Sequence, residues 1–186
     1  MATVILRPTS TTSQTGWAAD PILTAADNNT ATGVAQNNVT CNWSAVLADL
    51  DSSLSGATID KFQISAHAKP GRTGACTAVM SLVHSSDGAF AGETEAWLGG
   101  VPQTRTTSDR TTQQDGSSAL TYDYINNCSI KIDPNTQGMT LYELYVTVTY
   151  TPATGYGHEV NNVAAASIAK VTGVATASIA KVTGVD

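Results

Sequence analysis

Two segments of the chain alternate between apolar and polar side chains, as a β-strand with one buried face does. In residues 61–68 the apolar positions are Phe62, Ile64, Ala66 and Ala68. In residues 139–150 one face carries Tyr142, Leu144, Val146, Val148 and Tyr150, and the other carries Leu141, Glu143, Tyr145, Thr147 and Thr149. Both segments therefore predict strands that bury one side against a second layer of structure.

The rest of the chain predicts further short strands separated by frequent turns. We expect strands at residues 3–6, 39–47, 76–84, 120–125 and 128–132. Residues 9–16 are expected to form a loop, residues 93–98 one helical turn, and residues 103–114 a solvent-facing strand. Many short strands with little helix are typical of an all-β, antiparallel β-sandwich with Greek-key or jelly-roll connections.

Composition supports this fold class and excludes some functions. Charged residues make up only 13% of the chain, and the abundant Thr and Val favour strands. The net charge of −6 argues against a protein that grips nucleic acid through its phosphates. Residues 1–8 lack the basic start and long apolar run of a secretory signal, and no stretch has the length of a membrane span. We therefore expect synthesis in a host cytoplasm, with no nucleic-acid or membrane partner.

The cysteines do not indicate a disulfide framework or a zinc site. Cys41, Cys76 and Cys128 are odd in number, widely spaced and not part of a C-x-x-C motif. We expect three buried, reduced thiols.

The C-terminal region contains an internal repeat. Residues 166–174 recur without change as residues 177–185, with a step of eleven residues. Such short units cannot bury a core of their own and carry almost no charge, so they need another surface to lie on. We therefore divide the chain into a β-sandwich body, residues 1–152, and a C-terminal docking arm, residues 153–186.

Two conformations of the arm are compatible with the repeat. A step of eleven residues equals three helical turns of about 3.67 residues each. The β-branched residues and the glycine in each copy favour short strands or extended segments, broken at Thr172–Gly173 and Thr183–Gly184, that add to the edge of a partner's sheet. The residues predicted to make the docking contacts are Ile168, Lys170, Val171, Val174, Ile179, Lys181, Val182 and Val185.

No set of residues indicates catalysis, and we expect no enzyme activity and no cofactor. The chain has no G-x-S-x-G elbow, phosphate-binding loop or H-E-x-x-H motif. The arrangement most similar to a catalytic or metal site would form if the strands of His67 and His84 paired, with Asp87 nearby.

Calcium is the metal that the loops could bind. Residues 27–29 (Asp-Asn-Asn), with Asp49 and Asp51, offer oxygen ligands. Capped turns explain these residues more simply, so we predict no metal site.

Three aromatic residues are candidates for a subunit interface or a sugar-binding platform. Trp97 stands beside two glycines, and Tyr122 and Tyr124 alternate in a predicted strand. A core position is the simpler role for Trp97. Arg105 and Arg110, in a Thr-rich stretch, suit a contact between subunits better than an active site.

Four segments resemble virion proteins of tailed bacteriophages. Residues 2–8 are similar to the opening strand of such proteins, and a Thr/Ser-rich loop and Trp17 follow it. Residues 55–64 resemble their turn-and-strand element, residues 144–152 their closing strand, and residues 168–174 their C-terminal repeats. The resemblance implies a β-sandwich virion component that is commonly oligomeric, and it carries over no catalytic residue.

Together these observations predict a structural protein of a phage virion. The first hypothesis is a capsid decoration or cement protein, a homotrimer that fastens to the major capsid protein or another virion protein through many weak contacts and the arm. The alternative is a receptor-binding, carbohydrate-binding module of a tail or head fibre. A hydrolase on the same fold is the third reading and lacks a catalytic set.

Overall fold

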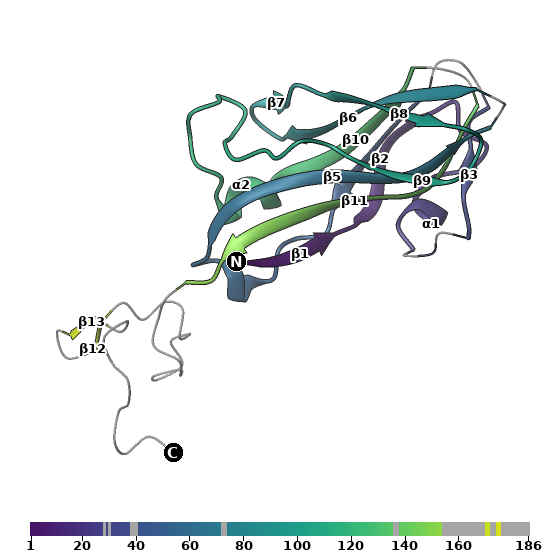
Figure 1. Cartoon of the computed structure of the whole chain (residues 1–186). Coiled ribbons are helices and arrows are strands. Elements are labelled where there is room, and N and C mark those ends of the chain that lie inside the picture. The colour runs from purple at the N-terminus through teal and green to yellow at the C-terminus, as the bar shows by residue number, and fades with distance from the viewer. Residues whose placement is uncertain are drawn as a thin grey trace.

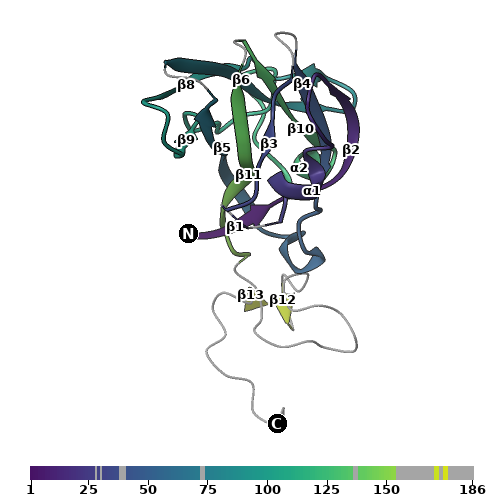
Figure 2. The same ribbon diagram turned by 90° about the vertical axis from the view of Figure 1, so that its right-hand side faces the viewer.

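Two antiparallel sheets pack face to face in the computed structural model of the chain (Figures 1 and 2). The structure describes residues 1–153 except 28, 30, 38–40, 72–73 and 136–137, and it describes the backbone of residues 170–171 and 174–175. The all-β, antiparallel β-sandwich predicted from the sequence is confirmed. No helix in the described ranges is long and apolar enough to cross a membrane.

Sheet A is built around two long strands. β5 (Thr58–Pro70) and β11 (Met139–Thr151) pair from one end to the other. β1 (Ala2–Leu6) pairs with β11 and β9 (Gln103–Thr106) pairs with β5, so these two strands form the edges. The short β3 (Val34–Ala35) pairs with the start of β11.

Sheet B covers the inner face of sheet A. Its strand order is β2 (Pro8–Thr15), β4 (Asn42–Leu47), β10 (Cys128–Pro134) and β6 (Ala75–His84). β7 (Gly88–Ala89) and β8 (Glu93–Leu98) pair with the two ends of β6. The chain passes between the sheets from β1 to β2, β2 to β3, β3 to β4, β4 to β5, β5 to β6, β8 to β9, β9 to β10 and β10 to β11.

The hydrophobic core lies between the sheets and draws on both. Its largest fully buried side chains include Trp43, Trp97, Phe62, Met80, Leu82, Ile130, Ile132 and Leu144. Each indole N–H in this set has a partner: Trp43 donates to Thr11 Oγ1 and Trp97 to the Gln103 carbonyl, both at 2.9 Å. Full burial of a large apolar side chain contributes about 1.5–3 kcal/mol, and the paired N–H groups avoid the cost of an unsatisfied donor.

The strand pattern was predicted correctly where apolar residues alternate and wrongly elsewhere. The strands predicted at 3–6, 61–68, 76–84, 128–132 and 139–150 are all present, and β4 occupies the described part of 39–47. Residues 9–16, predicted as a loop, form β2, and residues 93–98, predicted as a helical turn, form β8. Only the start of 103–114 is a strand. In β2 and β8 the pairing with a neighbouring strand decides the conformation, which local propensity does not reveal.

The prediction of a strand at 120–125 is wrong, because the segment forms α2 (Tyr122–Asn126). Thr121 is the N-cap, and its hydroxyl oxygen accepts a hydrogen bond from the N–H of Tyr124 at 3.1 Å. Asp123 lies in the first turn, where a negative charge is favourable. Two further short helical segments are α1 (Ile22–Ala25) and the 3₁₀ turn η1 (Ser52–Leu54).

β11 contains one extra residue opposite β5. Leu141 pairs with Ala68 and Glu143 pairs with His67, so Tyr142 has no partner on β5. An extra residue reverses the alternation of side chains between the two faces. Leu141 and Leu144 consequently both face the core. The predicted faces are right for Leu144, Val146 and Val148, and wrong for Leu141 and Tyr142.

Two short strands of the arm are described. β12 (Lys170–Val171) pairs antiparallel with β13 (Val174–Ala175). Short strands were one of the two predicted conformations of the arm, and the predicted breaks at Thr172–Gly173 and Thr183–Gly184 lie outside the described residues. The remaining predicted docking residues, Ile168, Ile179, Lys181, Val182 and Val185, lie outside the described residues.

We predict that removal of residues 154–186 leaves the body folded. Every core residue in the described part of the chain lies before β11 ends at Thr151, so we expect the truncation to leave the packing between the two sheets intact. The thermal midpoint of the truncated chain, followed by circular dichroism, should match that of the full chain. Unfolding of the truncated chain would show that the arm completes the core.

Candidate functional site

The outward side of sheet A carries a group of polar side chains that are neighbours in the strand register. Because side chains alternate along β5 and β11, the residues between the core positions all face outward. The cross-strand register places Glu143 beside His67, Tyr145 beside Ser65, and Thr147 beside Gln63. Arg7, the single residue between β1 and β2, joins them from the edge. We call Arg7, Gln63, Ser65, His67, Glu143 and Tyr145 the polar face.

Glu143 is the most buried charged residue of the polar face. Only 5% of its surface is exposed, although it lies on the outer side of the sheet. Arg7 Nη1 donates to Glu143 Oε1 at 3.4 Å, and the Arg7 guanidinium stands 5.3 Å from the centre of the Tyr145 ring. A carboxylate withdrawn from water needs a cation or donors nearby, and Arg7 supplies one.

The other members of the face are held by contacts to β9 and to the bulge. His67 Nδ1 lies 2.9 Å from Thr104 Oγ1, and Ser65 Oγ lies 2.8 Å from Thr106 Oγ1. The His67 ring meets the Tyr142 ring edge to face at 5.6 Å. Side chains fixed in this way lose little conformational freedom when a ligand binds.

The polar face combines three kinds of contact. Arg7 and Gln63 carry N–H donors, Glu143 carries acceptor oxygens, and Tyr145 presents a half-buried ring. Hydrogen bonds to charged groups are about twice as strong as neutral ones. The arrangement can therefore bind a ligand rich in hydroxyl groups, each of which both donates and accepts.

The predicted approach of His67 to His84 is wrong. Their strands, β5 and β6, belong to different sheets, and His67 faces outward from sheet A. Asp87 does lie beside His84, with 3.4 Å between His84 Nδ1 and Asp87 Oδ2.

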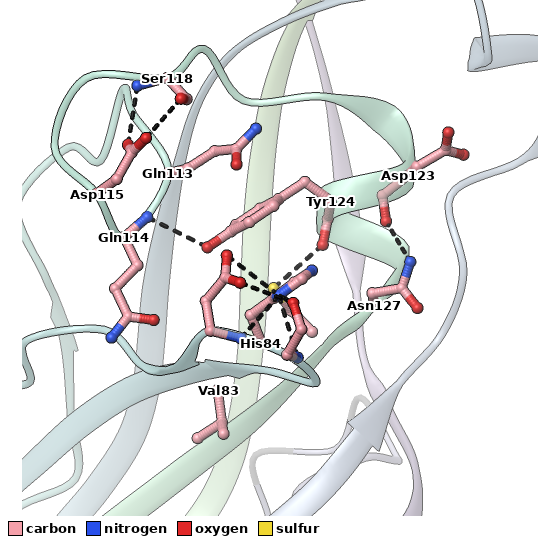
Figure 3. A network of polar contacts seen from close by, with 12 residues as sticks. Val83, His84, Gln113, Gln114, Asp115, Ser118, Asp123, Tyr124 and Asn127 are labelled. Carbon is pink, nitrogen blue, oxygen red and sulfur yellow. Dashed lines mark hydrogen bonds and ion pairs between the residues drawn. The ribbon is translucent and has the colours of Figure 1, made fainter.

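His84 belongs to a cluster at one end of the sandwich (Figure 3). Its ring stacks on the ring of Tyr124, with centroids 4.0 Å apart and planes at 5°. Ser86 Oγ lies 3.2 Å from His84 Nδ1 and donates to Asp87 Oδ1 at 2.7 Å. Burial raises the pKa of the Tyr124 hydroxyl, which accepts a hydrogen bond from the N–H of Gln114. These contacts tie the β6–β7 turn to α2.

Cys128 lies opposite His84 in the β10–β6 pair, which places a thiol beside a histidine and an aspartate. In cysteine nucleophiles the neighbours lower the pKa of the thiol. Here burial, and to a smaller extent the charge of Asp87, raise the pKa of the Cys128 thiol to about 12. The thiol donates to the Tyr124 carbonyl at 3.3 Å. The cluster therefore does not support cysteine catalysis.

The aromatic residues predicted for an interface or a sugar platform do not lie on the polar face. Trp97 has no exposed surface and belongs to the core, so it has no ring face for a ligand. Tyr124 is 6% exposed and is stacked on His84. Tyr122 is half-buried, and its hydroxyl donates to the Leu50 carbonyl at 3.0 Å. Burial excludes Trp97 as a glycan platform, and a role of Tyr122 or Tyr124 at an interface stays a prediction.

The acidic loop residues form capped turns. Asp27 Oδ1 accepts from the N–H of Asn29 at 2.8 Å, and Asp51 Oδ1 accepts from the N–H of Ser53 at 2.9 Å. Both contacts are the local turns that the sequence predicted as the simpler explanation. Within the described part of the chain, no three His, Cys, Asp or Glu side chains are placed to hold a metal ion.

The two arginines proposed for a subunit contact bind within the chain. Arg110 Nη2 lies 3.0 Å from Glu93 Oε1 and donates to the Ala91 carbonyl at 2.9 Å. Arg105 Nη2 donates to Gln103 Oε1 at 2.9 Å. A role between subunits stays a prediction.

No protein-family model and no curated protein sequence matches this chain. Among solved structures it is similar to the C-terminal CBM6 of LamC, a marine laminarinase from Zobellia galactanivorans, with a TM-score of 0.39, 11% identity, and coverage of 80% of this chain and 99% of that one. A carbohydrate binding module from Cellvibrio mixtus lichenase 5A, in complex with cellotriose, gives a TM-score of 0.45, 11% identity, and coverage of 80% and 97%. The enzymatically active domain of tailspike protein 4 of bacteriophage CBA120 gives 0.39 and 12%, covering 79% of this chain and 19% of that one. At these values the similarity carries no argument about function.

We predict that Cys128 makes the fold less stable at alkaline pH. The folded thiol keeps its proton up to about pH 12, whereas the unfolded thiol loses it near its ordinary pKa of 9.0. Above pH 9 the unfolded state therefore binds fewer protons, and the free energy of unfolding falls as the pH rises toward 12. Urea unfolding should show that the free energy of unfolding falls less between pH 8 and pH 10 in Cys128→Ala than in the natural chain. Equal losses would contradict the assigned burial of the thiol.

Proposed function

We propose that the β-sandwich body is a non-catalytic carbohydrate-binding module and that the polar face of sheet A binds the sugar. The observation that carries the proposal is the outward-facing, nearly buried Glu143, paired with Arg7 and adjacent in the outer row to Tyr145. Burial of a charge costs free energy. A carboxylate that is hidden from water on an outer face adds little to solubility, so its presence there suggests another role. In this proposal the role is to bind the hydroxyl groups of a sugar.

The chemistry of the face fits a sugar better than a protein or a nucleic acid. Vicinal hydroxyls present donors and acceptors at short spacing, and the C–H face of a sugar ring packs on an aromatic ring such as Tyr145. A protein interface of standard size needs an apolar centre, and Gln63, Ser65 and His67 do not provide one. The net charge of −6 disfavours binding to phosphates.

In this proposal the arm fastens the module to a larger assembly. That role is the sequence-based alternative of a receptor-binding module on a tail or head fibre of a phage. Several copies held together would multiply the effect of weak individual sites through effective concentration. The homotrimer predicted from the sequence would present three polar faces.

We expect substitutions on the polar face to weaken glycan binding without unfolding the protein. Tyr145→Ala should reduce affinity about tenfold, since an aromatic contact contributes about 0.5–1.5 kcal/mol. Glu143→Gln keeps the shape of the side chain and should reduce affinity by about ten- to a hundredfold, because a charge-assisted bond of about 1.5–3 kcal/mol is weakened. The measurement is a glycan array with the full chain, followed by calorimetry on the best ligand.

Thr94→Ala is the matched control, because Thr94 lies on β8 in the other sheet. This variant should bind like the natural chain, and all variants should show the same thermal midpoint within a few degrees. The absence of any glycan ligand, or natural affinity in both Tyr145→Ala and Glu143→Gln, would rule out the polar face as a sugar site.

Capsid decoration is the second candidate function, and the arm favours it. β12 and β13 lie within residues 170–175, and residues 166–174 recur without change as residues 177–185. Short segments of identical sequence suit repeated attachment to a lattice of identical subunits, such as a major capsid protein, and strand pairing like that of β12 with β13 would add them to sheet edges.

Co-sedimentation with empty, tail-free phage heads separates the two candidates. A decoration protein should bind heads saturably and in many copies, and removal of residues 154–186 should abolish the binding, because the arm supplies the contacts. A tail-fibre module should not bind such heads. Head binding by the truncated body would contradict the docking role of the arm.

A further inference from the structure

A hollow of about 450 Å³ opens on the outer side of sheet B, at the end where β4, β6 and β10 meet α2. Its volume falls in the range of sites that hold small ligands. Ser129 of β10 pairs with Val46 on one side and with Val83 on the other, so these three outward side chains form one row. Val46 is 41% exposed. The two valines give the hollow an apolar floor.

Two neighbouring asparagines line the hollow, and each is held at one end by the protein. The N–H of Leu50 donates to Asn126 Oδ1 at 2.8 Å. Asn127 Nδ2 donates to the Asp123 carbonyl at 2.8 Å (Figure 3). A backbone N–H can only donate and a carbonyl can only accept, so both amide orientations are fixed by their partners. Asn126 therefore offers an N–H donor, and Asn127 offers a carbonyl acceptor.

Among the residues that the structure describes, those lining the hollow include no carboxylate, lysine or arginine. Its titratable members are His84, whose ring is stacked on Tyr124, and Cys128, whose thiol is buried and keeps its proton. A charged ligand would lose its hydration without gaining a counter-charge. The site consequently suits a neutral group that has a small apolar part, one acceptor and one donor.

We propose that this hollow binds the acetamido group of an N-acetylhexosamine. The methyl group lies on Val46 and Val83, the acetamido carbonyl accepts from Asn126 Nδ2, and the acetamido N–H donates to Asn127 Oδ1. The acetamido chemistry follows from the hollow alone. The choice of a sugar as its carrier rests on the proposed function of the body.

The test is a titration of the ¹⁵N-labelled full chain, followed by NMR, with chitotriose, cellotriose and glucosamine in parallel. Chitotriose carries acetamido groups, whereas cellotriose and glucosamine do not. The expected result is a saturable shift of the backbone signals of Val46, Val83, Asn126 and Ser129 with chitotriose alone. Equal shifts of these signals with cellotriose would overturn the assignment of the acetamido group.

Asn126→Asp is the decisive variant. It keeps the oxygen that accepts from Leu50 and replaces only the donor nitrogen, so the fold is preserved while the bond to the acetamido carbonyl is lost. Affinity for chitotriose should fall about tenfold or more, which is the effect of one hydrogen bond and an unfavourable charge. Asn42→Asp introduces the same charge on β4, outside the hollow, and should bind as the natural chain does. Natural affinity in Asn126→Asp would overturn the proposal.

Val46→Thr tests the apolar floor with a side chain of nearly the same shape. It should also weaken chitotriose binding, since a hydroxyl replaces a methyl group that contacts the ligand. Unchanged affinity in this variant would likewise overturn the assigned contact.

The same titration separates this proposal from the proposed function. Shifts confined to Ser65, Thr106 and Tyr145 with any of the sugars would support the polar face and overturn the acetamido site. Shifts confined to residues of the hollow would support the acetamido site and overturn the polar face as the sugar site. An acetyl-lysine peptide serves as the fourth ligand, and shifts of the hollow signals with this peptide but not with chitotriose would overturn the sugar as the carrier of the group.

Discussion

The pairing of β5 with β11 is the constraint on which the rest of the structure depends. These two strands form the centre of sheet A, and β1, β3 and β9 attach to them. Their inward side chains, among them Phe62, Ile64, Leu144 and Val146, form one wall of the core. The extra residue at Tyr142 allows Leu141 to face inward as Leu144 does. Without it, strict alternation from Leu144 would place Leu141 on the outer side of the sheet, and the core would lose that side chain.

The polar face follows from the alternation of β11 after the bulge, where Glu143 and Tyr145 both point outward. Once Glu143 faces outward beside His67, it lies within reach of the chain segment that leaves sheet A for sheet B. Arg7 is the one residue between β1 and β2, and its carbonyl accepts a hydrogen bond from the N–H of Ala48 at 2.8 Å. The backbone between β1 and β2 therefore positions the Arg7 guanidinium next to Glu143 and Tyr145. A site whose charged group is positioned by the path of the chain between two sheets is rigid before any ligand arrives.

The sequence was sufficient for the fold class and for the strands that alternate most clearly, because burial on one face leaves a period of two in the residue types. It was insufficient where the conformation depends on a neighbour. β2 is rich in Ser and Thr, so its sequence predicts a loop, but pairing with β4 makes it a strand. The bulge at Tyr142 leaves no local signal, so the faces of Leu141 and Tyr142 were predicted wrongly. The register of β5 against β11, which places Glu143 beside His67, is not visible in either strand alone. The predicted aromatic platform failed for a related reason, since the indole of Trp97 finds its acceptor on Gln103 only after β8 and β9 are placed.

The two outer faces of the sandwich differ in chemistry, and this difference bears on how such a domain acquires function. The inward positions of both sheets are committed to the core, so only the outward positions and the loops are available for recognition. On sheet A the outward row combines a carboxylate, a guanidinium and a tyrosine. On sheet B the row of Val46, Ser129 and Val83 is neutral and ends at two anchored amides. The β-sandwich specifies neither chemistry, because each face can change without disturbing the core behind it. A module built in this way can contact two chemically distinct parts of one ligand, or two different ligands, from opposite sides of a single rigid body.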